Sequence, residues 1–296
     1  MYYEENPKEY HSSIVDVTDR CNLRCRHCFY FREEHDSEDL DDESFLSGLE
    51  ELRKRHNIMS MGWCGGEPLF RREVVLKGFN LFPLNTLYTN GTLPLPEVEN
   101  TLLAISIDGT PEIHDKIRGK GTFEKIINNV KSITSKGKFV LFLSTIHRIN
   151  FQHIEEMIEI LSQIPNSMTC IMFFTPLRRY KEVKGYKYTD EQKNFLDLTW
   201  EERDNVIYTV LKLRKKYPGR IFNPDRTLEL MLSENAGMCV SRCNMPRRTL
   251  TLDLKLNRKL PCVLGRDVDC SKCGCVFPYI QQAKKEGDPD SLRIRF

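Results

Sequence analysis

Short apolar runs alternate with longer amphipathic segments along more than half of the chain. The runs have the length and the β-branched and aromatic content of buried strands. They lie at 13–17, 59–63, 85–89, 102–107, 139–145 and 170–174. Helical periodicity is clearest at 44–56, 123–137 and 151–164. Because strands that alternate with helices pair in parallel through right-handed crossovers, the sequence predicts an α/β fold, as in an open or closed βα barrel.

The pattern changes after the sixth predicted strand. A polar, aromatic-rich segment at 177–193 leads into a predicted helix at about 200–216. Beyond residue 226 the chain holds six of its eleven cysteines, and the runs TLTLDL and KLPCVL predict a hairpin that turns at 255–258. We therefore expect two parts, a barrel over 1–225 and a small cysteine-rich extension over 226–296.

Composition narrows the class of protein. Forty per cent of the residues are apolar and the net charge is +2, so the strong positive field typical of nucleic-acid binders is missing and we expect no nucleic-acid partner. No signal peptide and no run of 18 apolar residues occurs, which predicts a cytoplasmic protein without a transmembrane segment. Cysteines are reduced in the cytoplasm, so clustered ones are better explained as metal ligands than as disulfides.

Three cysteines stand close together in CNLRCRHCF, just after the first predicted strand. They are Cys21, Cys25 and Cys28. Three thiolates from one short loop can hold three irons of a cubane iron–sulfur cluster, which leaves the fourth iron open to another ligand. A structural zinc site is the alternative, but it needs four ligands, and His27 lies inside the triplet where it is poorly placed to close a tetrahedron.

Two further motifs follow predicted strands. GGEP, after the second strand, consists of Gly65, Gly66, Glu67 and Pro68. SIDG closes the fourth strand and includes Ser106 and Asp108. Because the carboxyl ends of parallel strands form the active-site face of such sheets, we expect both motifs beside the cysteine loop. Simple turns are the alternative, since Gly and Asp-Gly are common in turns.

The spacing Cys-x3-Cys-x2-Cys followed by an aromatic residue resembles the signature of the radical SAM superfamily. The resemblance implies a partial (βα)6 TIM-like barrel with a 4Fe–4S cluster and S-adenosylmethionine (SAM) as cofactors. It also implies cleavage of SAM to methionine and a 5′-deoxyadenosyl radical, with an electron donor such as ferredoxin or flavodoxin. In such enzymes GGEP would contact the methionine part of SAM, with Glu67 near its ammonium group. Ser106 and Asp108 would meet the ribose, and Phe29 would pack by the adenine.

Further positions enter through the same resemblance or through their place at strand ends. HDKIRG, at 114–119, resembles a stretch of the subgroup that includes the molybdopterin-precursor cyclase and the peptide maturases. There Arg118 would pair with the carboxylate of SAM; a surface ion pair is the alternative. Thr145, Asn150 and Thr175 follow predicted strands and are candidates for lining the pocket, although helix caps and turns use the same residue types.

The C-terminal cysteines resemble those of a SPASM or shortened twitch extension, which carries auxiliary clusters. Asn257 stands where that pattern has glycine. The resemblance predicts one auxiliary 4Fe–4S cluster held by Cys243, Cys262, Cys270 and either Cys273 or Cys275, with Cys239 in reserve. A zinc ribbon is the alternative. Cys64 and Cys170 stand alone, and we expect them in the core.

The substrate is the least constrained prediction. The order of features resembles the branch that makes adenosylhopane and calditol, which implies a small-molecule, lipid-like or polyol substrate that the radical dehydrogenates or joins. A peptide-modifying maturase is the second interpretation. Clustered arginines could instead clamp phosphate or carboxylate; these are Arg178, Arg179, Arg247 and Arg248. A non-enzymatic iron–sulfur electron carrier or metal scaffold also stays open, although it would leave GGEP unexplained.

Overall fold

The computed structural model describes residues 9–32, 38–178 and 196–294. Seven strands are found there: β1 Ser12–Asp16, β2 Ser60–Cys64, β3 Leu84–Thr89, β4 Thr101–Ser106, β5 Val140–Ile146, β6 Ser167–Phe173 and β7 Thr249–Leu252. The helices of the barrel part are α1 Asp42–His56, α2 Arg72–Phe79, α3 Pro111–Arg118, α4 Thr122–Thr134, α5 Ile154–Ser162 and α7 Trp200–Lys216. Those that follow are α8 Asp225–Leu230, α9 Ser233–Ser241, α10 Met245–Arg248, α11 Phe277–Lys285 and α12 Pro289–Arg293. Short 3-10 turns are η1 Tyr30–Arg32, η2 Pro68–Arg71, η3 Phe151–His153 and η4 Cys270–Lys272.

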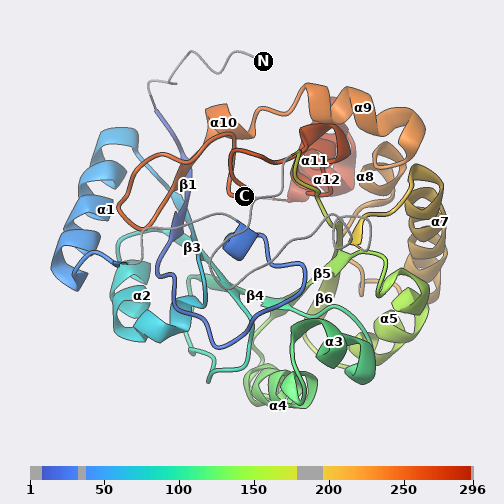
Figure 1. Cartoon of the computed structure of the whole chain (residues 1–296), viewed down its shortest axis with the longest axis horizontal. Helices are drawn as coiled ribbons and strands as arrows, with labels where there is room; N and C mark the ends of the chain where they lie inside the picture. The colour runs from blue at the N-terminus through green and yellow to red at the C-terminus, as the bar shows by residue number, and fades with distance from the viewer. Residues whose placement is uncertain (1–8, 33–37, 179–195, 295–296) are drawn as a thin grey trace.

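The strands form one parallel sheet in the order β6-β5-β4-β3-β2-β1-β7. Helices lie outside the curved sheet, as Figure 1 shows. Parallel strands joined through helices bring their carboxyl ends to one edge of the sheet, so the loops after β1, β2, β4 and β5 meet there. The predicted α/β class and partial barrel are confirmed.

Packing between sheet and helices is shown by the buried Trp63 of β2. Its ring meets Phe79 of α2 and Phe82 edge-on, with ring centroids 5.7 and 6.1 Å apart. Its indole Nε1 donates to Asn85 Oδ1 at 3.0 Å, so the one polar atom of the side chain is satisfied inside the core. Gly78 of α2 is required here, because a Cβ on it would lie 2.1 Å from the indole ring.

The predicted hairpin is confirmed at its turn and wrong in its second strand. TLTL forms β7, which pairs with β1 in parallel from Ser12↔Thr249 onward, and so adds a seventh strand to the sheet. The chain then turns back: Leu252 bridges Arg258 in antiparallel fashion and Lys259 N donates to Thr251 O at 2.7 Å. Among the described residues, KLPCVL forms no strand. The alternation of Thr and Leu correctly indicated a strand, but it does not identify the partner.

The turn after β7 contains one residue in the left-handed conformation. Leu256, not Asn257, has the left-handed conformation, with φ 63°. Asp253 closes the turn because its Oδ1 accepts hydrogen bonds from the N–H groups of Lys255 and Asn257 at 2.9 and 2.8 Å. The Leu256 side chain is directed at Gly48 of α1, where a Cβ would lie 2.5 Å from it, so packing accounts for the strained residue.

The C-terminal part also joins the opposite edge of the sheet. Val268 bridges Leu177 in antiparallel fashion, and Arg178 N donates to Asp267 O at 2.7 Å. Phe173 N, at the end of β6, donates to Gly274 O at 3.0 Å. The cysteine-rich segment is therefore built onto β6 while β7 is built onto β1. In the described part of the chain, no helix has the length and apolar character to cross a membrane.

Candidate functional site

The cysteine loop follows β1 and is tied to the GGEP loop by backbone hydrogen bonds. Gly66 N donates to Thr18 O at 2.7 Å and Glu67 N donates to Arg20 O at 2.8 Å. Gly65 has φ +116°, and a Cβ on Gly66 would lie 2.4 Å from Arg20 O. Both glycines are therefore required by the approach of the two loops to each other. The sequence-based prediction was that these glycines contact SAM. Their close approach to the cysteine loop is a second reason for glycine, and the motif alone does not reveal it.

Glu67 is fully buried and links the ends of β2 and β3. Its carboxylate accepts hydrogen bonds from Leu69 N, Thr89 Oγ1 and Asn90 N at 3.1, 2.8 and 2.7 Å. Burial raises the pKa of this carboxyl. Pro68 next to it is buried and begins η2. In this structure the Glu67 oxygens thus accept hydrogen bonds from groups of the protein itself. The residue thereby orders the GGEP loop, which is expected to contact the methionine part of SAM.

The three thiols of the triplet lie close enough for their charges to interact. Burial raises the pKa of Cys21 to about 11 and that of Cys28 to about 12, and neighbouring cysteine thiolates add to both shifts. Cys21 Sγ accepts from Leu23 N at 3.4 Å and from Asn90 Nδ2 at 3.8 Å. Such donors are typical around iron–sulfur thiolates, where they tune the reduction potential.

The donor set fits a thiolate-bound cluster by its chemistry: three interacting thiols on one short loop, two of them with N–H donors directed at the sulfur. Arg118 Nη1 lies 3.8 Å from Cys25 Sγ and provides the second case. No three His, Cys, Asp or Glu side chains of the described residues are arranged to hold a single metal ion.

Asp108 is the centre of a buried polar cluster beside the loop. Arg118 Nε donates to Asp108 Oδ2 at 2.5 Å, Thr145 N donates to Oδ1 at 2.8 Å, and His27 Nε2 lies 3.3 Å from Oδ2. Although burial opposes it, the charges of Arg118 and His27 hold the pKa of Asp108 well below its usual range. Asn150 Nδ2 donates to Asp108 O at 2.8 Å. The alternative of a surface ion pair for Arg118 is wrong, since Asp108 and Arg118 are 0% and 10% exposed.

Two buried histidines complete this cluster and were given no role from the sequence. His114 Nδ1 accepts from Asp108 N at 3.2 Å, and His147 Nδ1 accepts from Ile149 N at 3.2 Å. Burial, with a contribution from the charge of Arg118 and against the opposing charge of Asp108, lowers the pKa of each to about 4, so both are neutral at pH 7. The ring of His147 lies 5.0 Å from that of His27. His147 directly follows β5, and His114 lies in α3 within the stretch HDKIRG; these positions were the available signal.

The other predicted positions are distributed over the same face. Phe29 and Ser106 are half-buried, in the cysteine loop and at the end of β4. Thr145 is half-buried at the end of β5 and contributes its N–H to Asp108. Thr175 Oγ1 accepts from Gly274 N at 2.8 Å, so this side chain binds the C-terminal segment.

Five of the C-terminal cysteines come together. The pKa of each is raised by burial, and the group is linked throughout by thiol–thiol charge effects: Cys243, Cys262, Cys270, Cys273 and Cys275. Cys239 is buried in the core, with its thiol directed at Leu230 O at 3.9 Å and no thiol among the groups that shift its pKa. Cys64 and Cys170 are buried, as expected.

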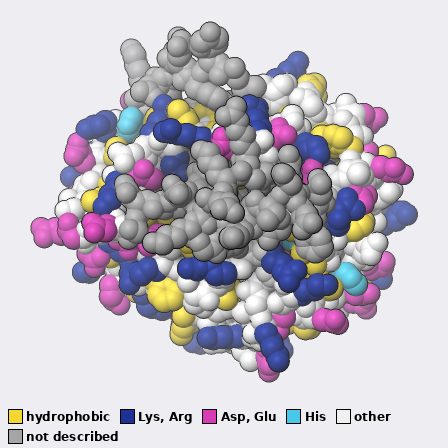
Figure 2. All heavy atoms as spheres, in the orientation of Figure 1, with side chains coloured by type: hydrophobic (Ala, Val, Ile, Leu, Met, Phe, Trp, Pro, Cys, Tyr) yellow, Lys and Arg dark blue, Asp and Glu magenta, His cyan; other side chains and the backbone are white. Residues whose placement is uncertain are grey.

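Three of the four arginines predicted to clamp phosphate or carboxylate lie within the described residues. Arg178, Arg247 and Arg248 are exposed, and Arg179 lies outside the described residues. Arg178 lowers the pKa of Cys270, opposing the effect of burial, and so lies near the C-terminal thiols. On the face that Figure 2 shows, cationic and anionic side chains are interspersed.

A parallel partial barrel with a three-cysteine loop after its first strand defines the class of radical SAM enzymes. The chain belongs to the radical SAM superfamily, whose model matches residues 15–161. Members of that superfamily use a 4Fe–4S cluster and SAM.

Three relatives show what the chain is similar to. It is 31% identical to the cysteine-type anaerobic sulfatase-maturating enzyme of Clostridium novyi over 48% of the chain and 45% of the relative. It is 29% identical to a probable GTP 3′,8-cyclase of Methanosarcina mazei over 86% of the chain and 77% of the relative. Native anSMEcpe with bound AdoMet and Cp18Cys peptide shares the fold, with a TM-score of 0.64, 19% identity, and coverage of 96% and 84%. The chain spans less than half the length of the curated maturases that it matches.

Proposed function

We propose that this protein cleaves SAM reductively and uses the resulting radical to modify a peptide, with one auxiliary iron–sulfur cluster in its C-terminal part. The observation that carries the proposal is the presence of two sets of cysteines at the same end of the sheet. Three lie in the loop after β1, and five lie in the C-terminal part, which is joined to the end of β6. Three thiols would leave one iron of a four-iron cluster without a protein ligand, whereas five thiols are enough to supply all four ligands of a second cluster.

When bound, the cofactors would supply the difficult chemistry, which is the one-electron reductive cleavage of SAM to methionine and a 5′-deoxyadenosyl radical. The chain supplies position and charge. Cys21, Cys25 and Cys28 would hold the cluster. The Glu67 carboxylate ties the GGEP loop to the end of β3, and the Glu67 N–H donates to Arg20 O next to the cysteine loop. Arg118, buried between Asp108 and Cys25, would offer its remaining N–H donors to the carboxylate of SAM.

The auxiliary cluster would take four of the five interacting C-terminal thiols. Cys243, Cys262 and Cys270 remain our first three ligands, with Cys273 or Cys275 as the fourth. Cys239 is set aside, because the core holds its thiol apart from the others. A reduced ferredoxin or flavodoxin would supply the electrons.

A peptide substrate is favoured over the lipid-like one expected from the sequence. Of the relatives reported above, one is named for maturing a sulfatase, and the solved structure with the same fold holds a peptide beside AdoMet. A nucleotide is the second candidate, because the relative named as a GTP cyclase aligns with 86% of this chain.

Incubation of the anaerobically reconstituted protein with SAM, reductant and peptides encoded by neighbouring genes tests the substrate. Mass spectrometry should find a peptide that has lost hydrogen or gained a cross-link, in proportion to the 5′-deoxyadenosine formed. A parallel incubation with GTP is the comparison. Conversion of GTP with no change in any peptide would contradict the peptide proposal and leave SAM cleavage standing.

A further inference from the structure

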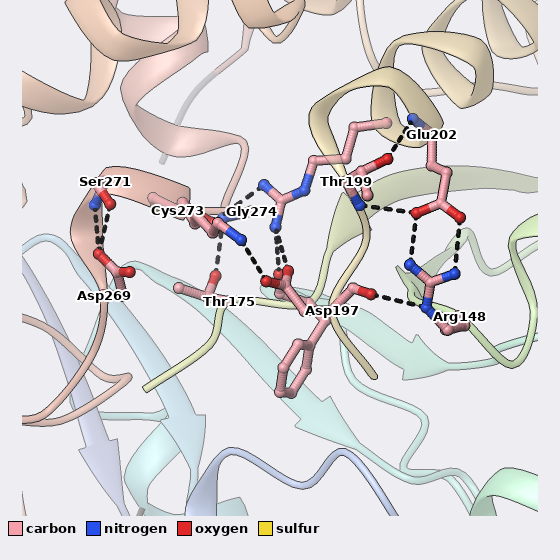
Figure 3. A network of polar contacts seen from close by, with 12 residues as sticks. Arg148, Thr175, Asp197, Thr199, Glu202, Asp269, Ser271, Cys273 and Gly274 are labelled. Carbon is pink, nitrogen blue, oxygen red and sulfur yellow. Dashed lines mark hydrogen bonds and ion pairs between the residues drawn. The ribbon is translucent and has the colours of Figure 1, made fainter. Parts of the chain in front are cut away.

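A buried arginine joins α7 to the C-terminal cysteine segment. Arg203 is 3% exposed, and its Nη1 donates to Lys272 O at 3.1 Å while its Nη2 donates to Phe174 O at 3.0 Å. Nη2 also lies 3.5 Å from Asp197 Oδ1. The guanidinium therefore connects α7, the residue after β6 and the residue just before Cys273. Figure 3 shows the polar network to which Asp197, Cys273 and Gly274 belong.

A second cation shares the same carboxylate. Lys272 Nζ donates to Asp197 Oδ2 at 2.5 Å, so one half-buried aspartate stands between two positive charges. Arg148 Nε donates to Asp197 O at 3.1 Å and fixes the backbone of this residue from the end of β5. The group holds two cations and one anion, and its net charge beside the cysteine segment is positive.

The start of α7 holds Arg203 in place. Thr199 and Glu202 form a capping box, and the Glu202 carboxylate also receives Arg148 Nη1 and Nη2 at 2.7 and 2.6 Å. Because Arg203 follows Glu202 directly, its backbone lies in a rigid first turn, and its hydrogen bonds to Lys272 O and Phe174 O fix the side chain. Arg203 is therefore pre-organised in the structure described here.

Cys273 lies within this arrangement. Its peptide group follows the Lys272 carbonyl that Arg203 binds, and its own carbonyl accepts from Tyr279 Oη at 2.8 Å. Gly274 next to it is pressed against β6, where a Cβ would lie 1.9 Å from Phe173 O. The thiol of Cys273 is thus held at a fixed place relative to the buried guanidinium.

We propose that Arg203 and Asp197 set the reduction potential of the C-terminal cluster, Arg203 raising it and Asp197 lowering it. The proposal rests on the auxiliary cluster of the proposed function. Reduction adds one negative charge to a thiolate-bound cluster, and a buried cation nearby stabilises that charge strongly where the dielectric constant is low. Asp197 has the opposite effect, because it offsets the charges of Arg203 and Lys272. Arg203 acts here as a positioning residue and as a fixed charge.

Arg214 provides a matched control on the same helix. It is likewise held by two backbone carbonyls and one aspartate: Nη1 donates to Ile221 O and Asn223 O at 2.8 and 2.5 Å, and Nε to Asp225 Oδ1 at 2.5 Å. Arg214→Met removes a similar set of contacts on α7 without changing the charge beside the cysteine segment. Asp197→Asn is nearly isosteric and removes only the charge of the carboxylate.

The experiment is a redox titration of the reconstituted protein followed by electron paramagnetic resonance, with iron content and thermal unfolding measured on each variant. Arg203→Met should lower the ratio of reduced to oxidised auxiliary cluster at least tenfold at a fixed potential, which is a shift of about 59 mV for a one-electron couple. Asp197→Asn should shift the couple in the positive direction. Arg203→Lys should retain most of the potential, and Arg214→Met should leave it unchanged.

Shifts of the same sign in Arg203→Met and Asp197→Asn, or no shift in either, would overturn the proposal. If the Arg203→Met protein does not bind the auxiliary cluster, the nearly isosteric Asp197→Asn variant alone tests the proposal. If the Asp197 carboxylate had only a structural role, its loss would not raise the reduction potential. A wild-type protein that binds iron for the first cluster only would refute the auxiliary cluster and this proposal together, and iron content separates that result from a failure of the charge effect.

Discussion

Lys259 Nζ lies 2.6 Å from Asp16 Oδ2, so a residue of the C-terminal part is paired with the last residue of the first strand. The two side chains are 12% and 1% exposed. Because β7, just before Lys259, also pairs with β1, the C-terminal part completes the barrel interior as well as its edge. The predicted boundary at residue 225 therefore separates segments that share one sheet.

Breaking the Asp16–Lys259 pair should be costly. Lys259→Met leaves a buried carboxylate without its cation, and the free energy of unfolding should fall by about 3–5 kcal/mol. The double variant Asp16→Asn with Lys259→Met should recover part of that loss, because no charge is then left uncompensated. Urea unfolding of the cluster-free protein measures both. Equal losses in Lys259→Met and in the double variant would contradict this expectation, since removal of the unpaired charge would then have recovered nothing.

Alanine substitutions of two glycines should each remove a different iron–sulfur cluster. Gly66→Ala would place a Cβ 2.4 Å from Arg20 O and displace the cysteine loop, whereas Gly274→Ala would place one 1.9 Å from Phe173 O. We expect each variant to lose the iron of one cluster, about four atoms per chain. Gly237→Ala is the control, since nothing lies within 4 Å of the added Cβ. Iron analysis and paramagnetic resonance would contradict this if both variants lost the same signal.

The buried histidines predict a pH dependence of stability. The pKa of His114 and His147 is about 4 in the folded chain, against 6.5 for the unperturbed group. Between these values the unfolded chain binds more protons, so stability is complete above pH 6.5 and is lost as pH falls toward 4. From pH 7 to pH 5 each histidine should cost on the order of 2 kcal/mol.

Urea unfolding of the cluster-free protein at several pH values measures this dependence. The variant with both His114→Gln and His147→Gln should show a flatter profile over the same range, whatever its absolute stability. His153, which is half-exposed on the surface, provides the control substitution. A profile equally steep in the double variant would assign the pH dependence to other groups.

Much of the barrel could be predicted from local pattern. The six apolar runs lie within one to three residues of β1 to β6, and the helix expected at 44–56 is α1, capped by Asp41. β7 could be predicted as a strand but not placed, because its partner β1 lies 237 residues away at Ser12↔Thr249 and sequence periodicity carries no pairing information.

The sequence predicted which residues form the site better than it predicted their contacts. CNLRCRHCF and GGEP were placed at strand ends correctly, yet Glu67 is engaged by Thr89 and Asn90, two residues of a strand end to which the sequence gave no role. Likewise Asp108 was expected to face a sugar, and in the structure its carboxylate is bound by Arg118 and Thr145 N. Such contacts depend on the exact approach of loops, which short motifs do not encode.

The most direct test of the central claim is the release of 5′-deoxyadenosine. The anaerobically reconstituted protein, given SAM and dithionite, should form 5′-deoxyadenosine and methionine in equal amounts. Cys25→Ala should form none, because it removes one of the three thiolates of the first cluster. Cys64→Ala serves as the control, since that thiol is buried at the end of β2 and is not assigned to either cluster. No release by the wild-type protein, or the same release by Cys25→Ala, would contradict the account.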